Sequence, residues 1–340
     1  MKIFYVSVIE KHAGWGHEYF INKALIAPGH ETHCLDYRKD RSRLYRCFIN
    51  TPECDAFLLQ RGDYFPLPLI RAVRPPRFFL TTELVSRRQD QERLLRSGLF
   101  DHVFLHTRAC VDAVISRKWL KPEQCSLLLL AFDEGLHRKI PGTVKDIDLL
   151  FVGWLSKRRR TILEKISSRF NCLSAAAYGE ALVRLANRAK IVLNIHAEDF
   201  PDTETRVFET LGCGSFLLSE YLSSENPFSE RELVQFKDTE DLMKKARYFL
   251  DHEEEREAIA ARGHAAALQN HTYTHRARQI IETVSHCLDS GNREKGRFIR
   301  RGWDLRVYAL TKPFLIVHYL YAKKILPYLP KIRLQKGGNR

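Results

Sequence analysis

The chain has 340 residues, 44% of them hydrophobic, so it can bury two ordinary cores. Its net charge of +14 is uneven: residues 291–340 hold 13 Lys and Arg against Glu294 and Asp304, a net +11, which leaves +3 for the rest. The eight cysteines form no CxxC pair, which argues against a zinc or redox motif and favours free thiols in a reducing compartment. No run approaches the roughly 20 apolar residues of a spanning helix, and the apolar start lacks the cleavage site of a secretion signal. We therefore expect a cytoplasmic protein, soluble or held peripherally at the inner face of a membrane.

Apolar runs in the first half of the chain are typical of buried β-strands. Helical patterns separate most of them, including residues 17–26, 88–99 and 109–119. Alternating strands and helices predict a parallel, doubly wound sheet. The expected strands span residues 2–8, 31–37, 54–60, 77–82, 101–107 and 126–131.

A glycine turn follows the first expected strand. Gly14 and Gly16 flank Trp15 just before the first helix, as in a dinucleotide-binding fingerprint. Tyr19 stands where that fingerprint needs its third glycine. A GxG pair alone is a weak signal, so we do not expect NAD.

Several strands in this half end in polar residues. Arg61-Gly62-Asp63, Thr81-Thr82-Glu83 and His106-Thr107-Arg108 each follow an apolar run. Side chains at the carboxyl ends of parallel strands either cap the next helix or contact a ligand. Both alternatives stay open for each of these three sites.

A second domain is expected after the break at Pro141-Gly142, with a new sheet beginning at Ile147. Its first strand runs into Gly153 and is followed by four cations, Lys157 to Arg160, before a helix expected over 161–170. Cations in a loop between strand and helix create a positive potential that suits an anion. The alternative is an ordinary solvated basic patch.

Residues 189–221 form the most informative stretch. An apolar run ending in Asn194 and His196 predicts a buried strand with polar groups at its carboxyl end. Asp202 or Thr203 is the expected cap of a helix running through Glu209, and Gly212 and Gly214 are expected to end it. This is a βαβ unit with its loop at the edge where open α/β sheets bind ligands.

Arg206 lies in the first turn of that helix, where free N–H groups and the helix dipole favour anions. Its forked guanidinium suits a phosphate. Glu209 lies nearly on the same helical face and would repel phosphate, so its natural partner is a neutral diol such as a ribose. A solvated ion pair between Arg206 and Glu209 is the alternative.

Residues 128–283 resemble the C-terminal half of GT-B glycosyltransferases, specifically the spore-maturation CgeB-like branch of glycosyltransferase group 1. The remainder of the N-terminal half resembles it only in outline. The wider group often carries two glutamates separated by seven residues; Glu209 matches the second, whereas Pro201 stands at the first and Asp202 is a nearby substitute. The resemblance lies in residues 146–153, 190–196, 206–209, 211–218, 241–242, 248–250, 271–273 and Arg276.

The resemblance implies two Rossmann-like domains facing a cleft: residues 1–143 on the acceptor side, 144–290 binding a nucleotide-diphosphate sugar, and 291–340 as a basic helical tail. It implies transfer of a hexose to a hydroxyl of a glycan or lipid-linked acceptor in envelope assembly, with retention of configuration. No cofactor or metal is expected. The expected catalytic residues are Arg206, Glu209, His106 and Glu83. The expected donor contacts are Gly153, Lys157, Arg160, Asn194, His196, Asp202, Arg206, Glu209 and Gly212, and the expected acceptor-side contacts are Gly14, Gly16, Glu83 and His106.

The tail holds a short apolar and aromatic segment, residues 313–322, between cations. It is too short to cross a bilayer and fits a helix lying on an anionic membrane surface. A helix packed on the N-terminal domain is the alternative. The tail and the absent glutamate also leave open a non-catalytic binding protein of the same fold, recruited to a membrane or an anionic polymer. Nucleic-acid binding, suggested by the pI of about 9.4, lacks a recognisable reading module.

Overall fold

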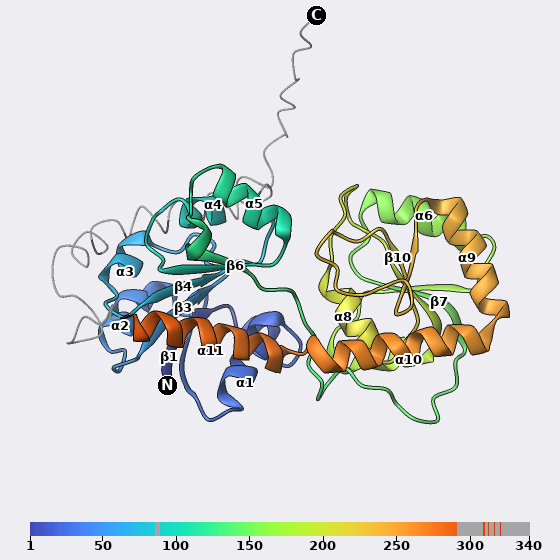
Figure 1. The fold of residues 1–340 in the computed structure, drawn as a ribbon, viewed down its shortest axis with the longest axis horizontal. Coiled ribbons are helices and arrows are strands. Elements are labelled where there is room, and N and C mark those ends of the chain that lie inside the picture. The colour runs from blue at the N-terminus through green and yellow to red at the C-terminus, as the bar shows by residue number, and fades with distance from the viewer. Residues whose placement is uncertain (86–88, 291–308, 310–311, 313–315, 317–319, 321–340) are drawn as a thin grey trace, which may run out of the picture.

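The computed structural model describes residues 1–85, 89–290, 309, 312, 316 and 320, and they form two α/β domains (Figure 1). The N-terminal sheet has six parallel strands in the order β2-β1-β3-β4-β5-β6. This confirms the predicted doubly wound sheet. The strands are β1 (Lys2–Ser7), β2 (Glu31–Asp36), β3 (Ala56–Gln60), β4 (Arg77–Leu80), β5 (His102–Leu105) and β6 (Cys125–Leu127).

Helices cover both faces of this sheet, because its central strands are buried on both sides. In β3, Phe57 and Leu59 point into one core while Ala56 and Leu58 point into the other. The first core also takes side chains from α2 to α5, and the second takes them from α1. These helices are α1 (His17–Ile26), α2 (Leu44–Ile49), α3 (Leu67–Ala72), α4 (Gln89–Leu95) and α5 (Arg108–Ser116), with short 3-10 turns at Glu10–His12, Arg41–Arg43 and Pro122–Gln124.

The C-terminal sheet has five parallel strands in the order β11-β10-β9-β7-β8, and it begins at Ile147 as predicted. Its strands are β7 (Ile147–Val152), β8 (Cys172–Ala175), β9 (Ala189–Asn194), β10 (Leu217–Glu220) and β11 (Val234–Phe236). Its helices are α6 (Lys157–Ser167), α7 (Gly179–Arg188), α8 (Thr205–Gly212), α9 (Thr239–Asp251) and α10 (Glu253–Asn270).

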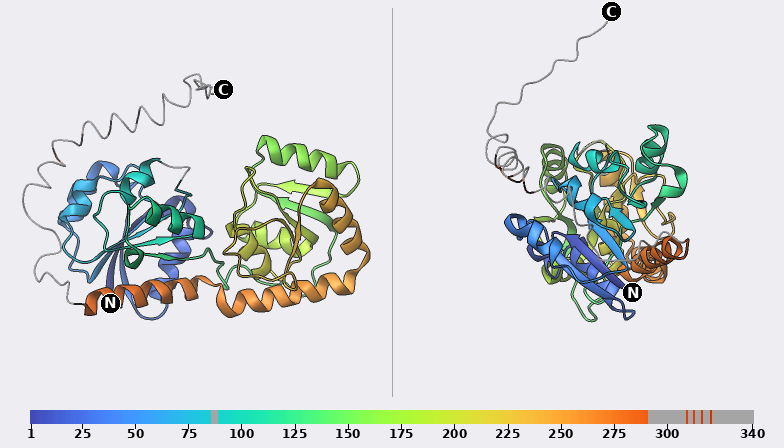
Figure 2. Two further views of the ribbon diagram at one scale, coloured as in Figure 1. Left: turned by 45° about the horizontal axis from the view of Figure 1, so that its top comes forward. Right: turned by 90° about the vertical axis from the view of Figure 1, so that its left-hand side faces the viewer.

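The last long helix, α11 (Tyr273–Asp289), returns to the N-terminal domain, as Figures 1 and 2 show. Its apolar stripe is buried in the core beneath α1 and includes Tyr273, Ala277, Ile280 and Val284. The C-terminal domain expected over residues 144–290 therefore needs correction, since its last helix packs on the other domain. A helix with such a stripe must bury it, and the N-terminal sheet offers the complementary face.

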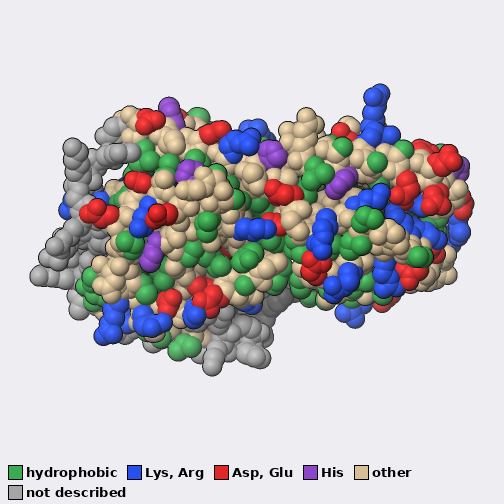
Figure 3. All heavy atoms as spheres, turned by 90° about the horizontal axis from the view of Figure 1, so that it is seen from below, with side chains coloured by type: hydrophobic (Ala, Val, Ile, Leu, Met, Phe, Trp, Pro, Cys, Tyr) green, Lys and Arg blue, Asp and Glu red, His purple; other side chains and the backbone are tan. Residues whose placement is uncertain are grey.

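The chain crosses between the domains twice, and the two crossings pair. Phe132 and Thr272 form a parallel bridge, and the Tyr273 N–H donates to the Phe132 carbonyl at 3.0 Å. Over the face seen in Figure 3, Lys and Arg side chains intersperse with Asp and Glu over both domains, in keeping with the small net charge outside the tail.

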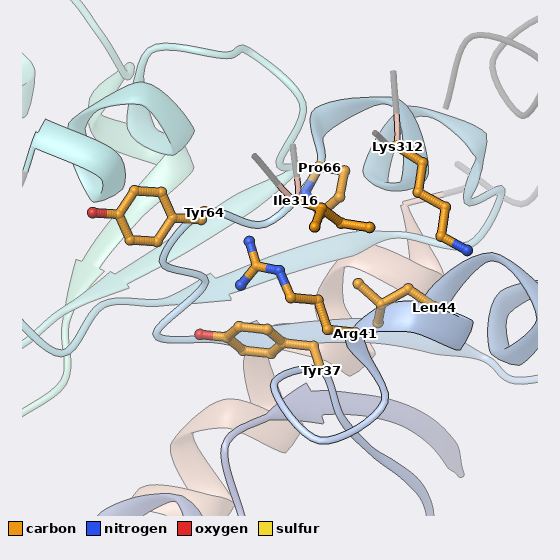
Figure 4. A pocket seen from close by; sticks show the side chains of 7 residues that line it. All are labelled: Tyr37, Arg41, Leu44, Tyr64, Pro66, Lys312 and Ile316. Atoms are coloured by element: carbon orange, nitrogen blue, oxygen red, sulfur yellow. The ribbon is translucent and has the colours of Figure 1, made fainter. Parts of the chain in front are cut away.

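Most of the tail, including most of the predicted aromatic segment 313–322, lies outside the described residues. Lys312 Nζ donates to the Ser42 carbonyl at 2.6 Å. Lys312 and Ile316 line a small hollow on the N-terminal domain together with Tyr37, Arg41, Leu44, Tyr64 and Pro66 (Figure 4). No helix within the described part of the chain is both long and apolar enough to cross a bilayer.

Candidate active site between the two domains

A cavity of about 440 Å³ lies between the domains, lined by residues from both. It gathers residues that follow the carboxyl ends of strands: Arg61 after β3, His106 after β5 and Gly153 after β7. This is the edge where open parallel sheets bind ligands. The lining comprises His17, Glu18, Arg61, Thr82, Glu83, Leu84 and His106 from the N-terminal domain, Leu130, and Phe151, Val152, Gly153, Trp154, Arg159, Tyr178, Asn194, Ala197, Asp202, Glu204, Thr205 and Arg206.

Arg206 lines the cavity in the first turn of α8, as predicted. The helix begins at Thr205 and its N-cap is Glu204, without a side-chain capping bond, so the expected cap at Asp202 or Thr203 is wrong. Asp202 itself lines the cavity. Because the Glu204 side chain does not cap α8, the first N–H groups of the helix suit an anion.

Arg206 and Glu209 form the ion pair that the sequence left open, with Nη1 and Oε2 3.0 Å apart. The pair is largely buried, its side chains being 15% and 13% exposed, so it is not a solvated one. Glu209 also lies 3.6 Å from Nε2 of the buried His137, in the segment that crosses between the domains. Burial lowers the pKa of His137 although Glu209 opposes this. Glu209 is not among the lining residues, and its contact with a ribose stays a prediction.

Among the four consecutive cations at residues 157–160, the one that lines the cavity differs from the two expected. Lys157 and Arg160 are exposed and do not line the cavity, whereas Arg159 is buried and does. The reason is that α6 begins at Lys157, capped by Ser156, whose Oγ accepts from the Arg159 N–H at 3.2 Å. In this helical frame Arg159 faces the sheet while Lys157 and Arg160 face solvent. The selection of Lys157 and Arg160 is therefore corrected to Arg159.

The Arg159 guanidinium connects three segments that meet at this edge. It donates to the Ile195 carbonyl at 2.7 Å, to the Trp154 carbonyl at 3.1 Å and to the Glu204 carboxylate at 3.1 Å. Burial alone would raise the pKa of Glu204, but His196 and Arg159 hold it below its usual value. Arg159 thus fixes the loop after β7, the end of β9 and the cap of α8.

Asn194 lines the cavity and donates to Ser219 Oγ at 2.9 Å. His196 does not line it; its Nε2–H donates to the Tyr221 carbonyl at 2.9 Å. Burial alone would lower the pKa of His196, but Glu204 and the Tyr221 carbonyl raise it. His196 therefore holds the loops beneath the site instead of facing the ligand, contrary to expectation.

Of the four predicted glycines, only Gly153 lines the cavity, with a φ of +155° that other residues rarely adopt. A Cβ on Gly212 would lie 2.3 Å from the Phe132 ring, so this glycine permits the close packing of α8 on the interdomain segment. Gly14 and Gly16 lie outside the lining, on either side of Trp15, whose ring packs at a tilt against Tyr178 with ring centroids 4.3 Å apart. That turn therefore contacts the other domain.

Glu83 and His106 both line the cavity, so the structure brings these two predicted residues to one wall. The residues after β5 include both a helix cap and a lining residue, the two roles that the sequence left open. Thr107 caps α5 by accepting from the Cys110 N–H at 3.1 Å, and the preceding His106 lines the cavity. Among the described residues, no three His, Cys, Asp or Glu side chains gather as a metal site requires.

Three further residues of this wall were not predicted as site residues: His17, Glu18 and Arg61. Arg61 adopts a left-handed φ of +69° and pairs with Glu18, Nη2 to Oε1, at 2.6 Å. Burial opposes ionisation of Glu18, but His12 and Arg61 lower its pKa to about 2. Burial, aided by Arg61, lowers the pKa of His17 to about 4, so this imidazole is neutral at pH 7. Only the strand-end position of Arg61 signalled this cluster in the sequence.

Comparisons with known proteins agree with this architecture. Residues 149–282 match a family model described as glycosyl transferase-like, and no curated protein matches the chain. A sucrose-phosphate synthase structure from Thermosynechococcus elongatus superimposes with a TM-score of 0.64 at 10% identity, covering 85% of this chain and 100% of that one. HepE of Anabaena in complex with UDP gives 0.61 at 13% identity, covering 84% and 100%. A glycosyltransferase from Rickettsia africae gives 0.64 at 8% identity, covering 85% and 99%. The chain thus has the GT-B fold of two Rossmann-like domains.

Proposed function

We propose that this protein is a glycosyltransferase that moves a sugar from a nucleotide-diphosphate-sugar donor to a hydroxyl acceptor. The observation that carries the proposal is the interdomain cavity, in which Arg159 and Arg206 on one wall share a space with Glu83 and His106 on the other. Support also comes from the glycosyl transferase-like match and from the GT-B neighbours, one of which was solved with UDP. We keep the CgeB-like branch as our assignment within the group.

We place the donor diphosphate at Arg206, Arg159 and the start of α8, where Glu204 makes no capping bond. When the bond to the sugar breaks, negative charge develops on the leaving diphosphate. Fixed guanidinium groups and helix N–H dipoles in a partly enclosed site stabilise that charge without having to reorganise. Arg159 takes the role first given to Lys157 and Arg160. This arrangement supplies the charge stabilisation without a bound metal, so activity should persist in a chelator.

The acceptor is placed on the N-terminal wall, where Glu83 and His106 can hydrogen-bond or deprotonate its hydroxyl. We propose a glycan or lipid-linked acceptor of envelope assembly, presented at a membrane by residues 291–340. The tail's net charge of +11 supports attachment to anionic lipid. The contact of Lys312 with Ser42 supports a tail that also touches the N-terminal domain. We also propose retention at the anomeric carbon, which the family resemblance supports and which the NMR spectrum of the product would test.

The first experiment is a thermal-shift screen with UDP, GDP, ADP, CDP and dTDP, since a ligand that binds only the folded state raises Tm. Release of nucleotide diphosphate from the matching nucleotide sugars then distinguishes an enzyme from a binding protein. The expected result is a shift with one base and release from its sugar conjugate. A shift without any release supports the non-catalytic alternative, and neither shift nor release contradicts the proposal.

A further inference from the structure

Trp154 is the most exposed large aromatic side chain of the cavity, 71% of it being accessible. The other two tryptophans among the described residues are packed: Trp15 contacts the Tyr178 ring at a tilt, and Arg117 lies over Trp119 with its Cζ 4.9 Å from the ring centroid. No described aromatic ring or cation stacks on Trp154. A single exposed apolar residue is ordinary on a protein surface. Here the exposed ring lines a cavity, so it is positioned to contact a bound ligand.

The backbone that carries Trp154 is fixed, so its exposure does not come from a loose loop. The preceding Gly153 has the glycine-favoured φ of +155°, and its N–H donates to the Ala175 carbonyl at 3.0 Å. The Trp154 carbonyl accepts from Arg159 Nη1 at 3.1 Å. The indole is therefore held at the carboxyl end of β7, next to the guanidinium proposed to bind the diphosphate.

The cavity has an apolar corner at this point. β7 and β8 are neighbours, with Val152 paired to Ala175, so Trp154 and Tyr178 follow adjacent strand ends. Both side chains are exposed and both line the cavity. One face of Tyr178 is already covered by Trp15. The charged lining residues Glu204 and Arg206 lie instead at the start of α8, so a ligand here meets both an ionic wall and an aromatic face.

We propose that Trp154 is a stacking platform for a ring of the bound donor, either its nucleobase or its sugar. This inference rests on the proposed function and names a contact that selects the donor. Indole offers a large apolar face with a negative quadrupole, onto which a base stacks by its π-face and a pyranose by its C–H groups. Stacking of a base on an aromatic side chain changes affinity by roughly 5- to 100-fold when the side chain is truncated to alanine.

The test combines tryptophan fluorescence with calorimetry on the full chain, using UDP, UDP-glucose and the other nucleoside diphosphates as probes. Trp154→Phe keeps a smaller ring, Trp154→Ala removes it, and Trp119→Phe is the matched control outside the cavity. Because Trp154 is exposed, its two variants should keep the wild-type Tm. We expect a probe to quench fluorescence in wild type and Trp119→Phe but not in Trp154→Phe, and to bind Trp154→Ala about tenfold more weakly.

The probes separate the two rings. If a nucleoside diphosphate without a sugar is sufficient to quench Trp154 fluorescence, the base is the ring that stacks. If only the nucleotide sugar quenches it, the sugar is the ring that stacks. If Trp154→Ala binds every probe with the wild-type Kd, the stacking role is wrong and the proposed function is untouched. If the wild-type protein binds no probe, both the stacking role and the proposed function fail.

Discussion

On the C-terminal wall of the cavity Arg159 is fixed by hydrogen bonds to several elements and Arg206 by an ion pair within α8, whereas the N-terminal wall presents groups that can exchange protons. Arg159 alone joins the loop after β7, the end of β9 and the cap of α8. On the opposite wall, Glu83, His106 and the neutral His17 line the cavity together with the Arg61–Glu18 pair. The contrast suits a division of labour: one wall is preorganised for a leaving anion and the other handles a hydroxyl.

The largest effect is expected from Arg159→Ala. Removing the buried Arg159 guanidinium costs about 3 kcal/mol of the free energy of unfolding, because two carbonyls and the partly buried Glu204 lose their donor. Donor binding should fall with it. Urea denaturation and calorimetry measure the two losses. Arg160→Ala, on the exposed face of the same helix, is the control and should change neither. If Arg159→Ala behaves like Arg160→Ala, the C-terminal wall is not held as described.

Glu18→Gln tests the opposite wall through pH. The folded-state pKa of Glu18 is about 2, below its unfolded value, so the stability from its ionised form is present above about pH 4.5 and is lost as pH falls toward 2. The variant should lose on the order of 3 kcal/mol at pH 7 and progressively less on acidification. Chemical denaturation at pH 7, 4 and 3 measures this. Glu10→Gln, in the exposed pair with Lys39, is the control. A pH-independent loss would contradict the assignment.

Arg206→Ala should weaken the donor interaction without unfolding the protein. A charge-assisted contact contributes about 1.5–3 kcal/mol, or roughly 10- to 100-fold in kcat/KM. The measurement is release of nucleotide diphosphate by the purified variant, with circular dichroism to verify folding. Arg160→Ala again serves as the comparison. If Arg206→Ala turns over the donor at the wild-type rate, the diphosphate does not bind to Arg206.

Glu209→Ala gives a smaller effect that separates two roles. If Glu209 contacts a ribose, the variant binds the nucleoside diphosphate more weakly but binds pyrophosphate as the wild type does. If Glu209 only orients Arg206, from which it lies 3.0 Å, both ligands lose affinity together. Calorimetry with the two ligands measures the difference. Unchanged affinity for the nucleoside diphosphate would refute the ribose contact.

Truncation after Ser290 is expected to leave both walls unchanged and to remove only membrane attachment. The tail carries +11, and its attraction to anionic lipid should weaken with salt because charges are screened beyond about 10 Å at 0.1 M. Co-sedimentation of both chains with anionic and neutral vesicles measures this. If the shortened chain unfolds, the tail is a structural helix. If both chains bind anionic vesicles equally, the membrane proposal is wrong.

The sequence by itself determined the two parallel sheets, the place of Arg206 at a helix start, and Glu83 and His106 beyond strand ends. Each of these features follows from a local pattern, because apolar runs, glycines and polar strand ends determine the conformation of the residues next to them. Of four consecutive cations, the frame of α6 turns Arg159 inward, but the tertiary structure decided that it reaches the cavity edge, because its partners Ile195 and Glu204 lie far along the chain. It also decided that α11 returns to the N-terminal core and that Gly212 packs on Phe132. Such contacts join residues that are far apart in the sequence, so they depend on how complementary surfaces pack in the folded chain. Patterns within a short stretch of sequence do not predict them.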